Sequence, residues 1–259
     1  MTHLLNLNSD LGESFGPWEM GSDDAMLRIV NSANVACGFH AGDPLVMFTT
    51  AALAKENGVS IGAHPGFPDL QGFGRRRMDI PLAELEAMVT YQIGALDACA
   101  RAQGIRVTHV KPHGALSNIA CADRKVADAI ARAVYRLDPS LILLAPSASQ
   151  LVYAGRDKGL PIVEEIFADR AYLDDGNLVP RSQPGAMIHG AEASLQHVMR
   201  MVEESALISI NGKRLAVNPQ SICVHGDGAE AVATAQALRD GLTRAGYKLV
   251  ALPELVAAQ

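Results

Sequence analysis

The chain has 259 residues, of which 49% are hydrophobic and 19% are charged, and its formal net charge is −6. This composition supports a substantial core and argues against global disorder. The negative charge argues against binding to duplex nucleic acid, because phosphate contacts require clustered Lys and Arg. No apolar run approaches the roughly 20 residues of a membrane-spanning helix, and the N-terminal MTHLLNLNSD lacks the basic start of a signal peptide.

The four cysteines are far apart and form no CxxC pair; they are Cys37, Cys99, Cys121 and Cys223. They therefore indicate neither a zinc ribbon nor a thioredoxin-type redox pair, and they are typical of a reducing compartment. Together with the absence of membrane and signal segments, this predicts a cytoplasmic protein.

Seven short apolar segments alternate with longer helical patterns. The segments are rich in Val, Ile and Leu and are predicted to be strands, at residues 4–8, 33–39, 59–64, 107–113, 141–146, 162–167 and 221–226. Between them, one-sided apolar stripes predict helices, including those around 85–96, 195–202 and 232–242. In 207–217, Asn211-Gly212 between alternating residues predicts a hairpin before the last units.

This alternation, with nearly continuous apolar strands, is typical of a parallel sheet covered by helices on both faces. Seven such units favour an α/β fold of the TIM-like barrel type over an open doubly wound sheet, although periodicity alone does not separate the two. No linker or low-complexity segment interrupts the chain. Residues 1–259 are therefore predicted to form a single domain.

Polar residues gather directly after the predicted strands. In 32–44, an apolar strand ends in a run that contains Gly38, His40, Gly42 and Asp43. The carboxyl ends of the strands in a parallel barrel share one face, where active sites lie. We therefore expect these side chains to meet in one pocket: Asn8, Asp10, Glu13, His40, Asp43, His64, Lys111, His113, Glu165, Asp169, Arg170, His225 and Asp227.

The histidines divide into two groups by their position. His40, His64, His113 and His225 follow apolar runs, whereas His3, His109, His189 and His197 do not. One histidine at a strand end is more often a structural, hydrogen-bonded residue. Four in the same position favour a shared function, because helical packing gives no reason for such a bias.

Imidazoles and carboxylates together allow two kinds of chemistry. The candidate ligands for Zn²⁺ or a similar divalent ion are Asp10, His40, His64 and His113. No local HxxxH or HExxH spacing supports a metal, however. The same groups can perform general acid–base catalysis near neutral pH. Both alternatives stay open at this point.

Basic residues provide candidates for binding an anion. Lys111, inside VTHVKPH, is placed to bind an anion or to polarise a carbonyl group. In the run Arg75-Arg76-Arg77, Arg75 is the candidate for a phosphate or carboxylate, and a solvated surface loop suits at least two of the three equally well. The chain has no Walker-type phosphate loop, no GxGxxG after a strand and no GxSxG elbow.

Several longer motifs resemble the LamB/YcsF family, which forms the A component of 5-oxoprolinase. They are LNLNSDLGESFG (5–16), SANVACGFHAGDP (32–44), IGAHPGFPDLQGFGRR (61–76), VKPHGALSN (110–118), EEIFADRAY (164–172), LVPRSQPGAMI (178–188) and ICVHGD (222–227). The resemblance extends from the first predicted strand to the last. One departure is Ser117, where a tyrosine is expected, and it puts a role for a phenol at this position in doubt.

The resemblance implies an irregular seven-stranded β/α barrel similar to the glycoside hydrolase and deacetylase group. It also implies ATP-dependent opening of 5-oxo-L-proline to L-glutamate, performed with partner subunits B and C. ATP is then a co-substrate, and the missing phosphate loop implies that the partners supply much of the ATP handling. A divalent metal stays an open question.

Under this hypothesis, Asp10, His40 or His113 acts as the base, Lys111 and Arg170 stabilise negative charge, and another imidazole protonates the leaving nitrogen. The residues expected to bind substrate are Asn8, Glu13, Asp43, His64, Arg75, Arg170 and His225. Two alternatives belong to other classes. One is a stand-alone metal-dependent amidohydrolase or deacetylase, and the other is a non-catalytic subunit that presents substrate to its partners.

Overall fold

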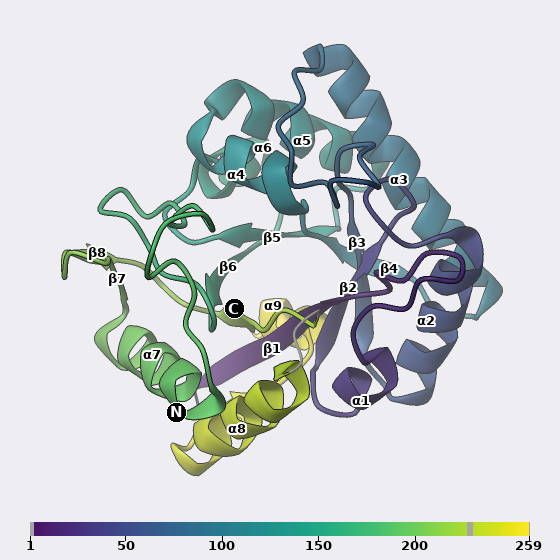
Figure 1. Cartoon of the computed structure of the whole chain (residues 1–259). Coiled ribbons are helices and arrows are strands. Elements are labelled where there is room, and N and C mark those ends of the chain that lie inside the picture. Colours follow the sequence, from purple (N-terminus) through teal and green to yellow (C-terminus); the bar gives the residue numbers. More distant parts are fainter. Residues whose placement is uncertain (1–2, 227–229, 259) are drawn as a thin grey trace.

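The computed structural model describes residues 3–226 and 230–258, and a closed barrel of parallel strands forms its centre (Figure 1). The strands of the barrel are β1 (Leu4–Leu11), β2 (Ser32–Ala36), β3 (Ser60–His64), β4 (Val107–Val110), β5 (Ile142–Pro146), β6 (Ile162–Phe167) and β9 (Ser221–Cys223). They pair in this order, and β9 also pairs with β1, which closes the sheet. The predicted seven-stranded β/α barrel is therefore confirmed.

Helices surround the barrel (Figure 1). In the described residues they are α1 (Asp23–Leu27), α2 (Pro44–Glu56), α3 (Leu82–Ala102), α4 (Gly114–Ala122), α5 (Arg124–Leu137), α6 (Gln150–Lys158), α7 (Ala191–Glu204), α8 (Ala231–Arg244) and α9 (Leu252–Ala257). The three predicted apolar stripes lie in α3, α7 and α8. Across the described ranges, no helix has both the length and the apolar character that a membrane span requires.

Helix α9 covers the end of the barrel where the strands begin. Its Leu252 and Leu255 pack in an apolar cluster with Ile142 and Val163, which lie at the starts of β5 and β6. Burying these side chains removes apolar surface from water and closes this end of the barrel. The functional side chains therefore have to be reached from the opposite end, where the strands terminate.

Several predicted strands end earlier than the sequence pattern suggests. Strand β2 ends at Ala36, β4 at Val110 and β9 at Cys223, and the residues that follow form the connecting loops. The predicted hairpin is confirmed as β7 (Ala206–Ile208) and β8 (Arg214–Ala216), which pair antiparallel. The sequence did not predict β10 (Lys248–Leu249), a short strand that pairs with the start of β1.

The barrel interior contains a network of buried polar side chains. Asn8 donates to the hydroxyl of Ser221 at 2.8 Å, which links β1 to β9. Asn34 of β2 donates to the side-chain oxygen Oδ1 of Asn8 at 2.7 Å, and its own side-chain oxygen accepts from His109 of β4 at 3.0 Å. Burial lowers the pKa of His109 to about 3, so its ring is neutral at pH 7. Each of these four side chains thus has a partner, which offsets the cost of removing it from water.

Gly62 of β3 provides the space that the His109 ring occupies. A Cβ atom at position 62 would lie 2.1 Å from Cδ2 of His109, inside the packed barrel. We predict that Gly62→Ala lowers the free energy of unfolding by roughly 1–3 kcal/mol, the usual cost of overpacking a core. The control is Gly94→Ala on α3, where no atom lies within 4 Å of the added methyl group. It should raise stability by about 0.5–1 kcal/mol. Urea denaturation of both variants measures these changes, and equal effects would contradict the packing argument.

Candidate active site

A buried lysine occupies the centre of the site. The Lys111 ammonium, just after β4, lies 2.9 Å from Asp10 Oδ1, 3.1 Å from Glu165 Oε1 and 3.0 Å from Cys223 Sγ. These contacts join the ends of β1, β4, β6 and β9. They also direct all three N–H donors of the amine at protein groups. The side chain also lines the cavity described below, so the role of Lys111 in binding an anion or polarising a carbonyl group stays a prediction.

The charges in this group depend on one another. Burial alone would raise the pKa of Asp10, but His64 and Lys111 hold it well below its usual value. Burial alone would lower the pKa of Lys111, but Asp10, Cys223 and Glu165 raise it well above its usual value. Asp10 and Lys111 are therefore both charged at neutral pH. Burial raises the pKa of Glu165 in spite of the nearby amine, and its Oε2 has no hydrogen-bond partner in the described residues.

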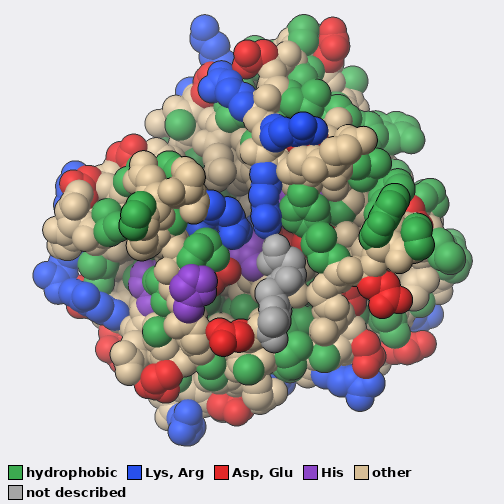
Figure 2. All heavy atoms as spheres, viewed as in Figure 1, with side chains coloured by type: hydrophobic (Ala, Val, Ile, Leu, Met, Phe, Trp, Pro, Cys, Tyr) green, Lys and Arg blue, Asp and Glu red, His purple; other side chains and the backbone are tan. Residues whose placement is uncertain are grey.

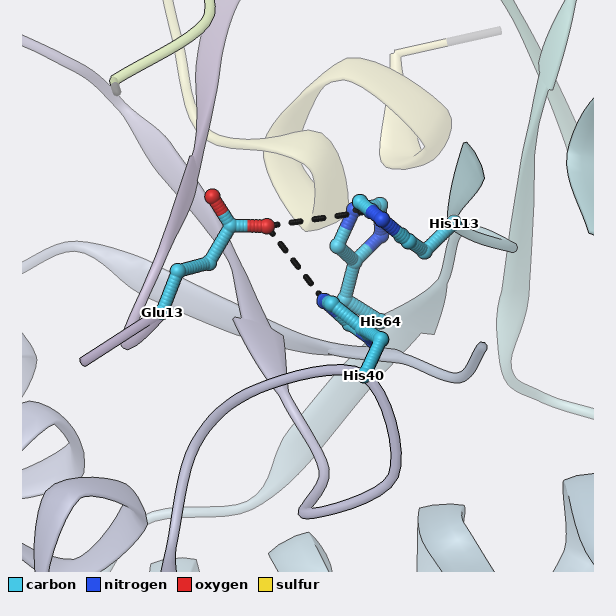
Figure 3. Close-up of side chains that lie close together, drawn as sticks. All are labelled: Glu13, His40, His64 and His113. Atoms are coloured by element: carbon cyan, nitrogen blue, oxygen red, sulfur yellow. Dashed lines mark hydrogen bonds and ion pairs between the residues drawn. The ribbon is translucent and has the colours of Figure 1, made fainter. Parts of the chain in front are cut away.

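Three histidines and a glutamate form a second group beside Asp10 (Figure 3). The rings of His40 and His113 stack with centroids 3.6 Å apart, and His113 Nδ1 lies 3.0 Å from His64 Nε2. Glu13 Oε1 lies 3.3 Å from His40 Nε2 and 3.7 Å from His113 Nδ1. All four side chains are buried. Burial lowers the pKa of His40 and of His113 well below the usual value, so neither ring is charged at pH 7.

The loop after β3 packs directly against these histidines. Gly74 has a φ of +61°, and a Cβ at this position would lie 2.7 Å from His40 Cβ and 2.9 Å from His113 Cδ2. Glycine is required here because both the left-handed backbone and the close approach exclude a side chain. The adjacent Phe73 carbonyl lies 2.8 Å from His113 Nε2. The loop thus orients one of the rings that it covers.

His225 and Asp169 form an acid–base pair on the other side of the cavity. His225 Nδ1 lies 2.7 Å from Asp169 Oδ2 and 2.9 Å from Oδ1, and its ring stacks on Phe167. Burial opposes the charged ring, but the Asp169 carboxylate raises the pKa of His225 above its usual value. The carboxylate also fixes the Nδ1–H tautomer, which leaves Nε2 for proton exchange.

A cavity of about 540 Å³ connects the two sides. Asp10, Glu13, His64, His113 and His225 line its floor, and its other charged lining residues are Arg75, Lys111, Arg170 and Arg181. Figure 2 shows Lys and Arg side chains bordering the hollow at this end of the barrel. The cavity can therefore accept a small molecule that carries negative charge, with acid–base groups at its base.

Most of the side chains predicted from the strand-end pattern do lie together. His40, His64, His113 and His225 are all at the carboxyl end of the barrel, but His40 lies beneath His113 and does not line the cavity. Asn8 also lies below the cavity, where it donates to Glu165 Oε1 at 2.9 Å. Neither residue is part of the cavity lining.

Asp43 is not part of the site, which corrects its predicted substrate-binding role. Its carboxylate caps α2 by accepting from Leu45 and Val46, and it accepts from Gly16 at 2.6 Å. A position after a strand is also a position before a helix, where an aspartate caps the first turn. Asp227 lies outside the described residues.

His197, on α7, is one of the histidines that do not follow an apolar run. It is half-buried, and its Nε2 lies 3.1 Å from the backbone oxygen of Arg170, which lines the cavity. Of the three arginines in sequence, Arg75 lines the cavity and lies over the Phe73 ring. Arg76 and Arg77 pair with Asp69 and Asp79 near the surface, as the solvated-loop alternative predicts.

Cys223 is the site residue that sequence reasoning missed. Burial raises the pKa of its thiol well above the usual value, so it contacts Lys111 as a neutral group. Glu165 and Asp169 follow the strand-end pattern, yet the pattern gave no role to either. Side chains alternate between the two faces of a strand. This alternation could have indicated that Glu165 of β6 and Cys223 of β9 lie on the inner face of the barrel.

Ser117, at the position where a tyrosine was expected, lines the cavity. A phenol lines the same cavity from a different segment, because Tyr172 is buried there and its hydroxyl oxygen accepts from the Phe167 backbone N–H at 2.7 Å. Burial raises the pKa of Tyr172 far above its usual value, so it remains neutral.

A closed β/α barrel with carboxylates, histidines and a lysine at its strand ends has the architecture of a barrel enzyme. The family model described as "LamB/YcsF family" matches residues 5–257. The chain therefore belongs to the LamB/YcsF family, as its motifs predicted.

Similar proteins cover almost the whole chain. The A subunit of 5-oxoprolinase from Azoarcus sp. (strain BH72) is 54% identical over 251 residues, which is 97% of this chain and 98% of that protein. The Bacillus subtilis (strain 168) protein of the same name is 52% identical, over 96% of this chain and 97% of its own length. The structure of the "Lactam Utilization Protein" from Thermus thermophilus has a TM-score of 0.90 and 44% identity, and covers 96% of this chain and all of its own. A "T48 deacetylase" with a TM-score of 0.52 and 16% identity, which covers 100% of this chain and 92% of that chain, shares the fold.

The central ion pair gives a prediction about stability and pH. Lys111→Met removes the partner of the buried Asp10 and Glu165 carboxylates, so it should cost about 3–5 kcal/mol of unfolding free energy at pH 7. An unpaired buried carboxylate has a raised pKa in the folded state, and its penalty disappears as pH falls through that value. The difference from wild type should therefore narrow between pH 8 and pH 5. Denaturant unfolding across this range measures it, and a difference independent of pH would contradict a charge-based cause.

Proposed function

We propose that this chain is the A subunit of an ATP-dependent 5-oxoprolinase, which opens the lactam ring of 5-oxo-L-proline to L-glutamate together with subunits B and C. The observation that carries the proposal is the near full-length similarity to proteins named as the A subunit of 5-oxoprolinase. The name of the Thermus relative, a lactam utilization protein, agrees with a cyclic amide as substrate. The cavity at the strand ends supplies the site for this chemistry.

The chemistry of the substrate fits the charges of the site. A five-membered lactam is a poor electrophile, and transfer of the ATP γ-phosphoryl group to its carbonyl oxygen makes the carbon susceptible to water. The activated molecule carries a carboxylate and a phosphate, which suits the guanidinium groups of Arg75 and Arg170 in the cavity lining. The chain has no phosphate-loop motif, so the partners carry much of the ATP handling in this proposal.

Ring opening needs a base for water and an acid for the leaving nitrogen. Water adds to the activated carbon, and the C–N bond of the resulting tetrahedral intermediate breaks as the nitrogen takes up a proton. A second water then hydrolyses the acyl phosphate that is left, which releases inorganic phosphate and the new carboxylate of glutamate. His225 is the proposed acid, because Asp169 holds its Nδ1 and raises its pKa. Asp10 stays ionised beside His64. We propose that it either acts as the base or positions the group that does.

Two other functions are tested together with this one. A stand-alone metal-dependent amidohydrolase would release product without ATP or partners. A chain that only presents substrate would retain binding and assembly, and its cavity variants would leave the rate of ring opening unchanged. Purified chain, with and without subunits B and C and ATP, is assayed for glutamate released from 5-oxoproline. Turnover only in the complete ATP-containing mixture supports the proposal, whereas turnover by the chain alone contradicts it.

The proposed acid makes a specific prediction. His225→Gln should lower turnover of the reconstituted complex by on the order of 10²-fold or more, the usual scale for a positioned acid or base. The matched control is His189→Gln, because His189 is exposed and does not line the cavity. Melting temperatures of both variants separate a chemical effect from lost stability. Equal turnover losses in the two variants would rule out the assignment.

The pH profile tests the role of Asp169. Because the carboxylate raises the pKa of His225, the ring stays protonated to a higher pH than a free imidazole. A general acid loses activity as pH rises through its pKa. Asp169→Asn should therefore move the alkaline limb of the kcat/KM profile to lower pH, and an unmoved limb would mean that another group titrates.

A further inference from the structure

One ring nitrogen from each of two neighbouring histidines points at the same space beside Glu13. His64 Nδ1 lies 2.6 Å from the Lys111 backbone oxygen, and His113 Nε2 lies 2.8 Å from the Phe73 backbone oxygen. A carbonyl oxygen only accepts hydrogen bonds, so these two nitrogens carry the protons. The other ring nitrogens, His64 Nε2 and His113 Nδ1, face each other at 3.0 Å.

The two rings are thus oriented as they would be around a shared positive centre. The surroundings of this space match such a centre, because Glu13 Oε1 and His40 Nε2 also border it. The four donor atoms lie within 4.8 Å of one another, and all four residues are buried. Ligands about 2.1 Å from one tetrahedral ion lie roughly 3.4 Å apart, and the observed separations of 3.0, 3.3 and 3.7 Å bracket this value.

We propose that Glu13, His40, His64 and His113 form a binding site for one divalent transition-metal ion of the Zn²⁺ type. Three imidazoles and one carboxylate are the ligands such ions prefer. The two backbone carbonyls act as the outer partners that orient metal-binding histidines. Glu13 takes the place that the sequence pattern gave to Asp10, whose Oδ1 is held by Lys111 and whose Oδ2 lies 3.4 Å from His64 Nε2.

A second cluster, Asp10, Cys223 and His225, also has donor atoms close together, but it is the weaker candidate. Lys111 contacts both Asp10 and Cys223, and its positive charge occupies the position that an ion would need. His225 is already held by Asp169. The four proposed ligands are imidazoles and a carboxylate, with no ammonium group among them. Three of them, Glu13, His64 and His113, line the cavity, so an ion can enter the site from there.

Metal content of the purified chain tests this inference without partners, ATP or lactam, so its failure is separate from a failure of the proposed function. Chelator-treated protein is dialysed against Zn²⁺ and analysed for bound metal, and Co²⁺ is added in parallel to record its visible spectrum, which reports coordination geometry. The variants are Glu13→Gln, which keeps the side-chain shape, and His64→Gln. The matched control is His225→Gln, which removes a ligand only from the second cluster.

We expect about one Zn²⁺ per chain in wild type and in His225→Gln, and less than about a tenth of that in Glu13→Gln and His64→Gln. Zn²⁺ should also raise the melting temperature of wild type but not of Glu13→Gln, since an ion that binds only the folded state stabilises it. A chelator-treated wild type that takes up no Zn²⁺ would overturn the site. Zn²⁺ retained by both ligand variants, or lost only in His225→Gln, would equally overturn it, because the ion would then be adventitious or held by the second cluster.

Discussion

The buried ammonium of Lys111 is the interaction on which the arrangement of this site depends. A charged amine inside a barrel is tolerated only when carboxylates compensate it, because its removal from water costs several kcal/mol. Asp10 and Glu165 provide this compensation from β1 and β6. The amine therefore draws together strands that are far apart in sequence, and it fixes the position of the Asp10 carboxylate to which His64 is adjacent.

This ion pair separates the site into two sides with different electrostatics. On the side of β1 to β4, burial keeps His40 and His113 neutral, and the Phe73 carbonyl selects which nitrogen of His113 is unprotonated. On the side of β6 and β9, Asp169 instead favours the charged form of His225. Identical side chains at equivalent strand ends thus acquire different chemistry, because one group faces carbonyls and neighbouring rings and the other faces a carboxylate.

The sequence predicted the barrel and the gathering of histidines because both follow from short-range pattern. Apolar strands and their polar ends are visible in the order of residues, and a closed parallel barrel converts that order into a common face. It did not reveal that Asp43 caps α2 or that Cys223 reaches Lys111. A helix cap and a ligand require the same residue types at a strand end, and only the relative orientation of two elements distinguishes them. Contacts across the barrel, such as Lys111 with Glu165, depend on strand register, which one sequence does not display.

The distribution of charge explains how one cavity can hold an anion above a floor of carboxylates. Asp10 is neutralised by Lys111 within 2.9 Å, so its negative charge is largely compensated inside the protein. The guanidinium groups of Arg75 and Arg170 belong to the cavity lining. Under the proposed function, the phosphate and carboxylate of an activated lactam would face these arginines, while its reacting carbon lies nearer the floor. The arginines then hold the substrate, and the residues at the floor transfer protons. Proton transfer therefore does not require the groups that hold the substrate to change their ionisation.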